Sequence, residues 1–166
     1  KSFGLAGLRI GCVYTTSEEL FEKIVENSDV MTTAGGIASI SQVAGQACMD
    51  KAYYWVDEFL AHLKGNRDYA VDRLNQMPLI KAYRPHATYL LYVDIRAFGM
   101  VSEEFVEYMK KHVKLAVVSG GEKFFGQGSE GYIRICFATS REILKEGLDR
   151  LEKGIQMLMK EKNLTE

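Results

Sequence analysis

The sequence predicts an α/β protein with three consecutive parts: a helical segment over residues 1–50, a connecting helix over 51–76, and a small α+β layer over 77–166. Three observations predict this arrangement. Apolar residues keep one helical face throughout the second part. After Pro78, short runs of β-branched and aromatic residues are typical of strands. Amphipathic segments lie between and after these runs, which favours a sheet covered by helices.

The stretch "TSEELFEKIVEN" predicts the first helix. Thr16 followed by Glu19 forms a capping-box pattern, and four apolar side chains between positions 20 and 25 then share one helical face. The next stretch, "MTTAGGIASISQVAGQACMD", predicts a polar, glycine-containing loop that leads into a tightly packed helix of small residues.

The clearest pattern lies in "KAYYWVDEFLAHLKGNRDYAVDRLNQM". One apolar stripe at helical spacing consists of Ala52, Val56, Phe59, Leu60, Leu63, Ala70 and Leu74. A helix of about 25 residues is roughly 40 Å long, so it is long enough to join two lobes. Pro78 is expected to end it.

The second half predicts strands at "LIKAYR", "TYLLYVDI" and "GYIRICFA", with "KLAVVSG" as a weaker fourth. A helix is expected at "SEEFVEYMKKH", with Ser102 as its cap and acids in its first turn. The last helix is expected from "TSREIL" onward, where Thr139 and Glu142 form a second capping box and leucines continue a buried stripe.

Composition excludes several classes of function. The 166 residues hold 21 basic and 22 acidic side chains, a formal net charge of -1, which provides no electrostatic attraction for nucleic acid or an anionic membrane. No apolar run approaches the roughly 20 residues of a membrane span. The first residues lack the pattern of a signal peptide. We therefore expect neither nucleic acid nor a membrane as a partner.

The cysteines at 12, 48 and 136 are odd in number and widely spaced, without a C-x-x-C pair. This pattern disfavours a zinc site or a disulfide framework and predicts buried free thiols in a reducing cytoplasm. The three histidines also lack ligand spacing, so no metal site is expected.

Arg134 lies in the middle of the apolar strand "GYIRICFA", on the face opposite Ile133, Ile135 and Phe137. A guanidinium in such a place needs an anionic partner. Two readings stay open: an internal salt bridge to one of the acids, or a bidentate seat for a substrate carboxylate.

The opening "KSFGLAGLRIG" places two cations, Lys1 and Arg9, in a stretch of small residues. Such a loop permits close backbone approach to a ligand, and a cation beside it suits a phosphate. Lys1 is either a solvated surface lysine or, if buried with a lowered pKa, an amine that forms a Schiff base with a carbonyl.

These residues resemble the pyridoxal-phosphate attachment motif of class I/II aminotransferases, the fold-type I enzymes. That motif has a lysine, two free positions, a small and an aliphatic residue, and ends on arginine, an aliphatic residue and glycine. All its fixed positions are matched here. The stretch "FGQGSEGYIRICFATS" is similar to the family's C-terminal arginine segment. The resemblance covers essentially the whole chain.

The resemblance implies that Lys1 bonds covalently to pyridoxal 5'-phosphate and later moves a proton at the substrate Cα. It implies that Arg9 holds the cofactor phosphate and that Arg134 binds the α-carboxylate of the amino acid. Tyr89 resembles an aromatic residue on the substrate side of the pocket, although Ala87 stands where relatives commonly have glycine. The loop with Thr32 and Thr33 resembles a segment that reaches the partner subunit's phosphate. Phe124 and Phe125 are expected to shape the turn before the arginine strand.

The family's upstream residues, including the aspartate that pairs with the pyridinium nitrogen, are not in these 166 residues. The resemblance therefore implies the C-terminal part of a homodimeric aminotransferase: the end of the large cofactor domain over 1–50, the connecting helix over 51–76, and the small domain over 77–166. We expect this part alone to be inactive and to expose apolar surface on residues 1–50, which the missing N-terminal part of the enzyme would cover.

Two other functions remain open. A carbon–sulfur β-lyase that cleaves cystathionine begins with the same chemistry, and segments such as "ATYLLYVDIRAFG" resemble that branch. A non-catalytic α/β module would leave Lys1 and Arg9 as surface charges. For an aminotransferase, the substrates would be an amino acid and a 2-oxo acid.

Overall fold

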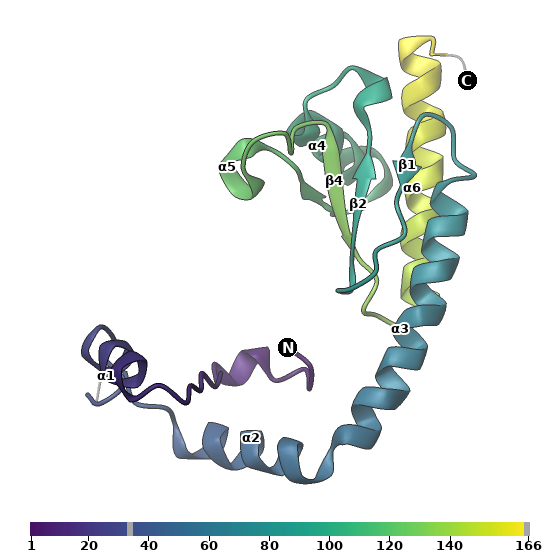
Figure 1. The fold of residues 1–166 in the computed structure, drawn as a ribbon. Helices are drawn as coiled ribbons and strands as arrows, with labels where there is room; N and C mark the ends of the chain where they lie inside the picture. The colour runs from purple at the N-terminus through teal and green to yellow at the C-terminus, as the bar shows by residue number, and fades with distance from the viewer. Residues whose placement is uncertain (33–34, 165–166) are drawn as a thin grey trace. The chain divides into compact units, whose positions relative to one another are not determined.

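The computed structural model describes residues 1–32 and 35–164 (Figure 1). The chain divides into two compact units, Lys1–Leu60 and Ala61–Glu166. Helix α3 (Tyr53–Leu74) runs through this division.

The first unit is helical. It contains the short 3-10 helix η1 (Ala6–Leu8), α1 (Glu18–Glu26), α2 (Ser39–Lys51) and the first turns of α3. The first helix begins one residue later than predicted. Ser17, not Thr16, is its cap, because the Ser17 hydroxyl accepts from Leu20 N (3.2 Å) and Ser17 has the extended backbone that a cap needs.

Little of the first unit is buried. Among its described residues only the side chain of Ser41 is fully buried, while Val13, Tyr14 and Met31 are 79–90% exposed. Burying large apolar side chains is the main source of folding free energy, so this unit has almost no core of its own. The exposed apolar surface expected for residues 1–50 is present.

The second unit contains an antiparallel sheet with the strand order β1-β2-β4-β3. Its strands are β1 (Lys81–Ala82), β2 (Leu90–Asp94), β3 (Val118–Ser119) and β4 (Tyr132–Cys136). All four predicted strands are found. The two edge strands pair over only two residues each, which is shorter than their sequence runs and typical of sheet edges.

The helices of the second unit are η2 (Arg96–Phe98), α4 (Ser102–Val113), α5 (Glu122–Phe125), α6 (Arg141–Lys162) and the later turns of α3. Figure 1 shows α6 alongside these turns of α3, and Arg73 of α3 pairs with Asp149 and Glu152 of α6. Every buried apolar side chain of the described chain, from Leu63 to Leu158, lies in this unit.

The other two predicted caps are also wrong. Helix α6 is capped by Ser140, whose hydroxyl accepts from Ile143 N (3.3 Å), and not by Thr139. Helix α4 has Val101 at its N-cap position, and the hydroxyl of Ser102 instead accepts from Gly131 N and Tyr132 N. In each case a hydroxyl lies near the helix start, but the local backbone decides whether it faces the free amides.

The predicted long helix is confirmed as α3, which ends at Leu74, four residues before Pro78. Leu63, Ala70 and Leu74 of the predicted stripe are buried, whereas Leu60 is 56% exposed. The stripe also includes a fully buried polar residue, Asn66, which the apolar pattern does not reveal.

Asn66 fixes α3 to the connection between β4 and α6. Its amide nitrogen donates to Phe137 O (3.0 Å) and Thr139 O (2.8 Å), and its side-chain oxygen accepts from Arg141 Nε (2.9 Å). A buried side-chain amide is stable only when its hydrogen bonds are formed, and these bonds require one particular geometry. They therefore fix the position of α3 relative to the segment between β4 and α6.

Cys12 and Cys136 are exposed and Cys48 is partly buried, so the prediction of buried thiols is wrong in this chain, although all three are free. Among the described residues, no helix is long and apolar enough to cross a bilayer. The same residues contain no cluster of three potential metal ligands.

Candidate cofactor and carboxylate sites

The N-terminal loop consists of consecutive tight turns. Gly4 N donates to Lys1 O (3.0 Å), Leu8 N to Leu5 O (2.9 Å), and Arg9 N to Ala6 O (3.2 Å). Gly4 and Arg9 both have left-handed backbone conformations, with φ of 70° and 51°. The turn at Gly4 therefore favours glycine, which adopts this conformation without strain.

Two contacts hold this loop on the helices of the first unit. The Ser41 hydroxyl of α2 donates to Leu8 O (2.9 Å). The Phe3 and Tyr53 rings meet edge to face with centroids 5.6 Å apart. These contacts order the segment between Lys1 and Arg9 although it contains little regular secondary structure.

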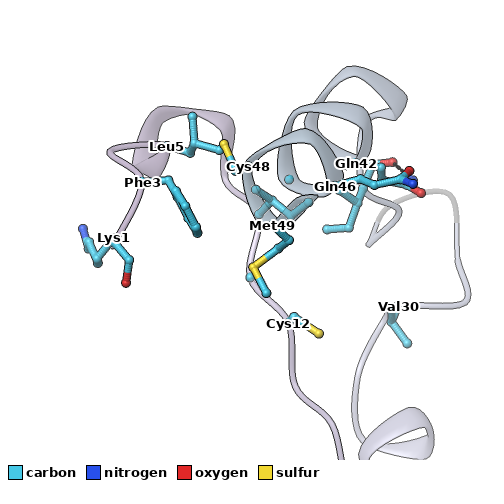
Figure 2. A pocket seen from close by; sticks show the side chains of 14 residues that line it. Lys1, Phe3, Leu5, Cys12, Val30, Gln42, Gln46, Cys48 and Met49 are labelled. Carbon is cyan, nitrogen blue, oxygen red and sulfur yellow. Dashed lines mark hydrogen bonds between the residues drawn. The ribbon is translucent and has the colours of Figure 1, made fainter. Parts of the chain in front are cut away.

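A pocket of about 780 Å³ lies between this loop and α2, with Lys1 near one end and Val30 near the other (Figure 2). Most of its wall is apolar, including Phe3, Leu5 and Met49. Arg9 and Thr32 are not among its lining residues. The pocket thus combines the side-chain amine of Lys1 with an apolar wall, and its described lining residues include no second cation.

Lys1 and Arg9 are both exposed, and neither has a carboxylate partner among the described residues. The hydroxyl of Thr32 donates to Asp29 O (2.8 Å) and accepts from Gly35 N (3.1 Å), so it closes its own turn. Thr33 lies outside the described residues. The roles of these two threonines stay predictions.

Arg134 lies on β4 in the second unit, directly opposite Tyr92 of β2. Its guanidinium carbon lies 5.3 Å from the centre of the Phe125 ring, a cation–π contact. The Tyr92 ring contacts both the Phe125 ring and the Tyr132 ring, with centroids 5.6 Å apart in each case. The half-buried Arg134 therefore contacts one ring of a cluster of three aromatic side chains, Phe125, Tyr92 and Tyr132.

The two interpretations of Arg134, an internal salt bridge or a binding site for a substrate carboxylate, differ in whether a carboxylate of the chain contacts its guanidinium. No carboxylate lies within ion-pair distance of Arg134 among the described residues. By contrast, Arg96 on the neighbouring turn binds both carboxylate oxygens of Asp94. The internal salt bridge is thus absent from this part of the chain, which favours the carboxylate seat.

The Tyr92 hydroxyl is buried without a hydrogen-bond partner, and it is the one such side-chain atom found in the described residues. Burial raises the pKa of Tyr92 above its ordinary 10.0, and the charge of Arg134 offsets part of this effect. Sequence reasoning missed this residue. The signal was available, because Tyr92 alternates with the buried Leu91 and Val93 and so shares the outer face with Arg134.

Tyr89, the predicted substrate contact, is not beside Arg134 in the sheet. Phe137 N donates to Tyr89 O (3.0 Å), so Tyr89 pairs with Phe137 at the other end of the two strands. Its predicted contact with substrate stays untested. Of the predicted turn residues, Phe125 contacts Arg134, whereas Phe124 is 66% exposed.

Residues 1–151 match the family model for aminotransferase class I and II, and the chain belongs to this family. The aspartate aminotransferase of Pyrococcus horikoshii is 33% identical over 94% of this chain and 39% of its own length. Cystathionine beta-lyase PatB of Bacillus subtilis is 27% identical over 93% of this chain and 40% of its own length.

Solved structures show the same fold. An aromatic aminotransferase from Pyrococcus horikoshii OT3 superimposes with a TM-score of 0.82 at 30% identity, over 99% of this chain and 42% of the other. A PLP-bound C-S lyase from Staphylococcus hominis gives 0.76 at 27% identity, over 93% and 37%. The predicted fold class is confirmed, and the chain spans about two fifths of the proteins that it matches.

Proposed function

We propose that this chain is the C-terminal part of a pyridoxal-phosphate-dependent aminotransferase, which transfers an amino group between an amino acid and a 2-oxo acid. The observation that carries the proposal is that Lys1, Arg9 and Arg134 have no carboxylate partner among the described residues. Unpaired cations on ordered elements suit anionic ligands, here a phosphate and a carboxylate.

The donor set fits the cofactor. Lys1 supplies a primary amine for its aldehyde, and Arg9 supplies a guanidinium for its phosphate at the other end of one ordered loop. Pyridoxal phosphate supplies, when bound, the electron sink that makes the substrate Cα proton easier to remove. Lys1 accepts and returns that proton as a general base and acid. Arg134 binds the α-carboxylate through two parallel hydrogen bonds and so orients Cα.

The proposal includes the rest of the enzyme as a partner. The exposed apolar side chains of the first unit, such as Val13 and Tyr14, support a covering segment, because contiguous apolar surface of this kind is unfavourable in water. In this proposal the domain boundaries lie near residues 50 and 76. The enzyme is a homodimer, and Thr32 or Thr33 contacts the cofactor phosphate in the active site of the neighbouring subunit. Three free thiols support a reducing, cytoplasmic location.

The same proposal implies that the 166 residues alone are inactive, because they lack the upstream aspartate that would keep the pyridinium nitrogen protonated. Isolated chain mixed with pyridoxal phosphate, an amino acid and a 2-oxo acid should show no amino transfer above the rate of free cofactor. Sustained turnover by the isolated chain would contradict this.

A carbon–sulfur β-lyase is the second candidate, since lyases are among the proteins that this chain matches. Lys1, Arg9 and Arg134 would have the same roles in that reaction. The two functions differ in the product: a lyase releases a thiol and pyruvate from cystathionine, whereas an aminotransferase needs a 2-oxo acid acceptor.

The test uses the full-length enzyme. Wild type should carry a yellow, covalently bound cofactor that borohydride reduction fixes to Lys1, identified by peptide mass, and Lys1→Ala should not. Amino transfer from aspartate or an aromatic amino acid to 2-oxoglutarate supports the aminotransferase, and thiol release from cystathionine supports the lyase. Failure of wild type to bind the cofactor would favour a non-catalytic module.

A further inference from the structure

The loop between β3 and β4 ends shortly before Arg134, and a backbone hydrogen bond joins its two ends. Gly120 N donates to Tyr132 O (2.7 Å) across its base. A Cβ atom on Gly120 would collide with the carbonyl oxygens of Ser129 and Tyr132, so this close approach requires glycine. The start of β4 is therefore attached to the end of β3.

A second set of bonds attaches the start of β4 to α4. The Ser102 hydroxyl accepts from Gly131 N (2.8 Å) and Tyr132 N (3.2 Å). In the other direction, one carboxylate oxygen of Glu130 accepts from Ser102 N (2.6 Å) and Gly131 N (3.0 Å). We call these four bonds the Ser102–Glu130 clasp. They join the first amide of α4 to three consecutive residues that lead into the arginine strand.

We infer that Ser102 and Glu130 are positioning residues for Arg134, which means that the clasp determines where the carboxylate-binding guanidinium lies. This inference rests on the proposed function of Arg134. The clasp fixes the backbone of Gly131 and Tyr132, and Arg134 follows two residues later on the same rigid strand. A shift of the strand by a fraction of an ångström would move the guanidinium away from a bidentate geometry.

The chemistry of the clasp favours a carboxylate at position 130. Hydrogen bonds from the backbone and hydroxyl of Ser102, and then from the Gly131 amide, lower the pKa of Glu130 below its ordinary 4.5. The charged group also lies at the N-terminus of α4, a helix of 12 residues, where the helix dipole favours negative charge. Ser102 is fully buried and anchors the clasp in the interior, whereas Glu130 is exposed and is held by its hydrogen bonds.

The experiment compares two substrates in the full-length enzyme. One is an amino acid, and the other is the amine with the same side chain but no carboxylate. For Glu130→Ala we expect kcat/KM for the amino acid to fall about tenfold while that for the amine changes less than about twofold. Glu130→Gln keeps an acceptor oxygen without the charge, so its fall should be smaller, about threefold. Glu103→Ala, an exposed acid of the same helix turn, is the matched control.

The outcomes separate the possibilities. An equal loss for both substrates would mean a general structural defect and would overturn the positioning role, as would an unchanged amino-acid preference in both Glu130 variants. Wild type without bound cofactor would instead refute the proposed function itself, and the positioning role with it. Cofactor absorbance and melting temperature, measured for each variant, show whether the enzyme remains folded and loaded.

Discussion

The environment of Arg134 illustrates how single residues decide between two chemistries. From the residues alone, both an internal salt bridge and a binding site for a ligand carboxylate stay open, since either satisfies a cation on a strand. In the structure this guanidinium lies over the Phe125 ring, and Arg134 is paired with Tyr92 on the neighbouring strand. Aromatic rings stabilise the cation and limit its rotation, but they do not occupy its hydrogen-bond donors. Within residues 1–32 and 35–164 no acceptor is bonded to those donors, so they are available to a carboxylate.

Arg134→Lys in the full-length enzyme should raise KM for the amino acid about tenfold or more, because an ammonium replaces two parallel hydrogen bonds by a point charge. Steady-state kinetics measures this. Arg150→Lys, on the exposed side of α6, is the control and should leave KM unchanged. Equal KM values for wild type and Arg134→Lys would contradict the assignment.

Tyr92→Phe should leave the free energy of unfolding unchanged or raise it by up to about 1 kcal/mol, because it removes a buried hydroxyl that has no partner. Urea unfolding measures the difference. Tyr108→Phe is the matched comparison, since the Tyr108 hydroxyl donates to Glu161 (3.0 Å) and its loss should cost up to about 1 kcal/mol. A clear loss of stability in Tyr92→Phe would reveal a partner for its hydroxyl.

At the level of secondary-structure elements, the N-termini of the helices show that a sequence pattern alone does not identify the N-cap residue. Two of the helices begin after a Thr-Ser pair, at 16–17 and at 139–140, and in both the serine is the cap. Either hydroxyl could cap a helix by its chemistry. At the start of α6 the backbone carbonyl of Thr139 is bonded by Asn66, which keeps Thr139 in the connection and leaves Ser140 at the first free amides.

Ser140→Ala should therefore lower the free energy of unfolding by about 1 kcal/mol, the usual value of an N-cap side chain. Thr139→Ala should have a clearly smaller effect, because the bonds at Thr139 use its backbone oxygen. Chemical denaturation of both variants provides the comparison. A larger loss of stability in Thr139→Ala than in Ser140→Ala would indicate that Thr139 is the N-cap of α6.

The clasp predicts a pH dependence for α4. Because the folded pKa of Glu130 lies below its ordinary 4.5, its contribution to stability is complete above that value and is lost as pH falls through the folded pKa. Wild type should thus be more stable than Glu130→Gln at neutral pH, and the difference should shrink below pH 4.5. Unfolding curves over this range test it; a constant difference would exclude ionised Glu130 as the cause.

At the scale of the whole chain, burial is distributed unevenly between the two units. Of the residues that the structure describes, all buried apolar side chains lie in the unit Ala61–Glu166, around the sheet and the helices α3, α4 and α6. Lys1–Leu60 has helices and turns but no comparable core. Because stability follows buried apolar area, the two units of the isolated chain should differ greatly in stability.

Hydrogen exchange on the isolated chain should show this directly. Amides of β2, β4 and α6 are expected to exchange slowest, and those of residues 1–60 close to the rate of unprotected peptide. Full-length enzyme is the control, in which residues 1–60 should become protected. Strong protection of these residues in the isolated chain would mean that they fold without a covering partner.

The sequence alone determined the order of the longer helices and the four strands and singled out three cations, because these depend on local periodicity and on residue types in a short motif; the short helices η1, η2 and α5 were not predicted. Only the tertiary structure decided which hydroxyl caps a helix, that Asn66 is buried, that the Phe125 ring contacts Arg134, and that the Glu130 carboxylate accepts a hydrogen bond from Ser102 N. Each of these contacts depends on residues distant in sequence or on the exact backbone angle at one position. The periodicity within a segment does not indicate which side chains come into contact across the fold. Many side chains could form such contacts by their chemistry, and tertiary packing decides which of them do.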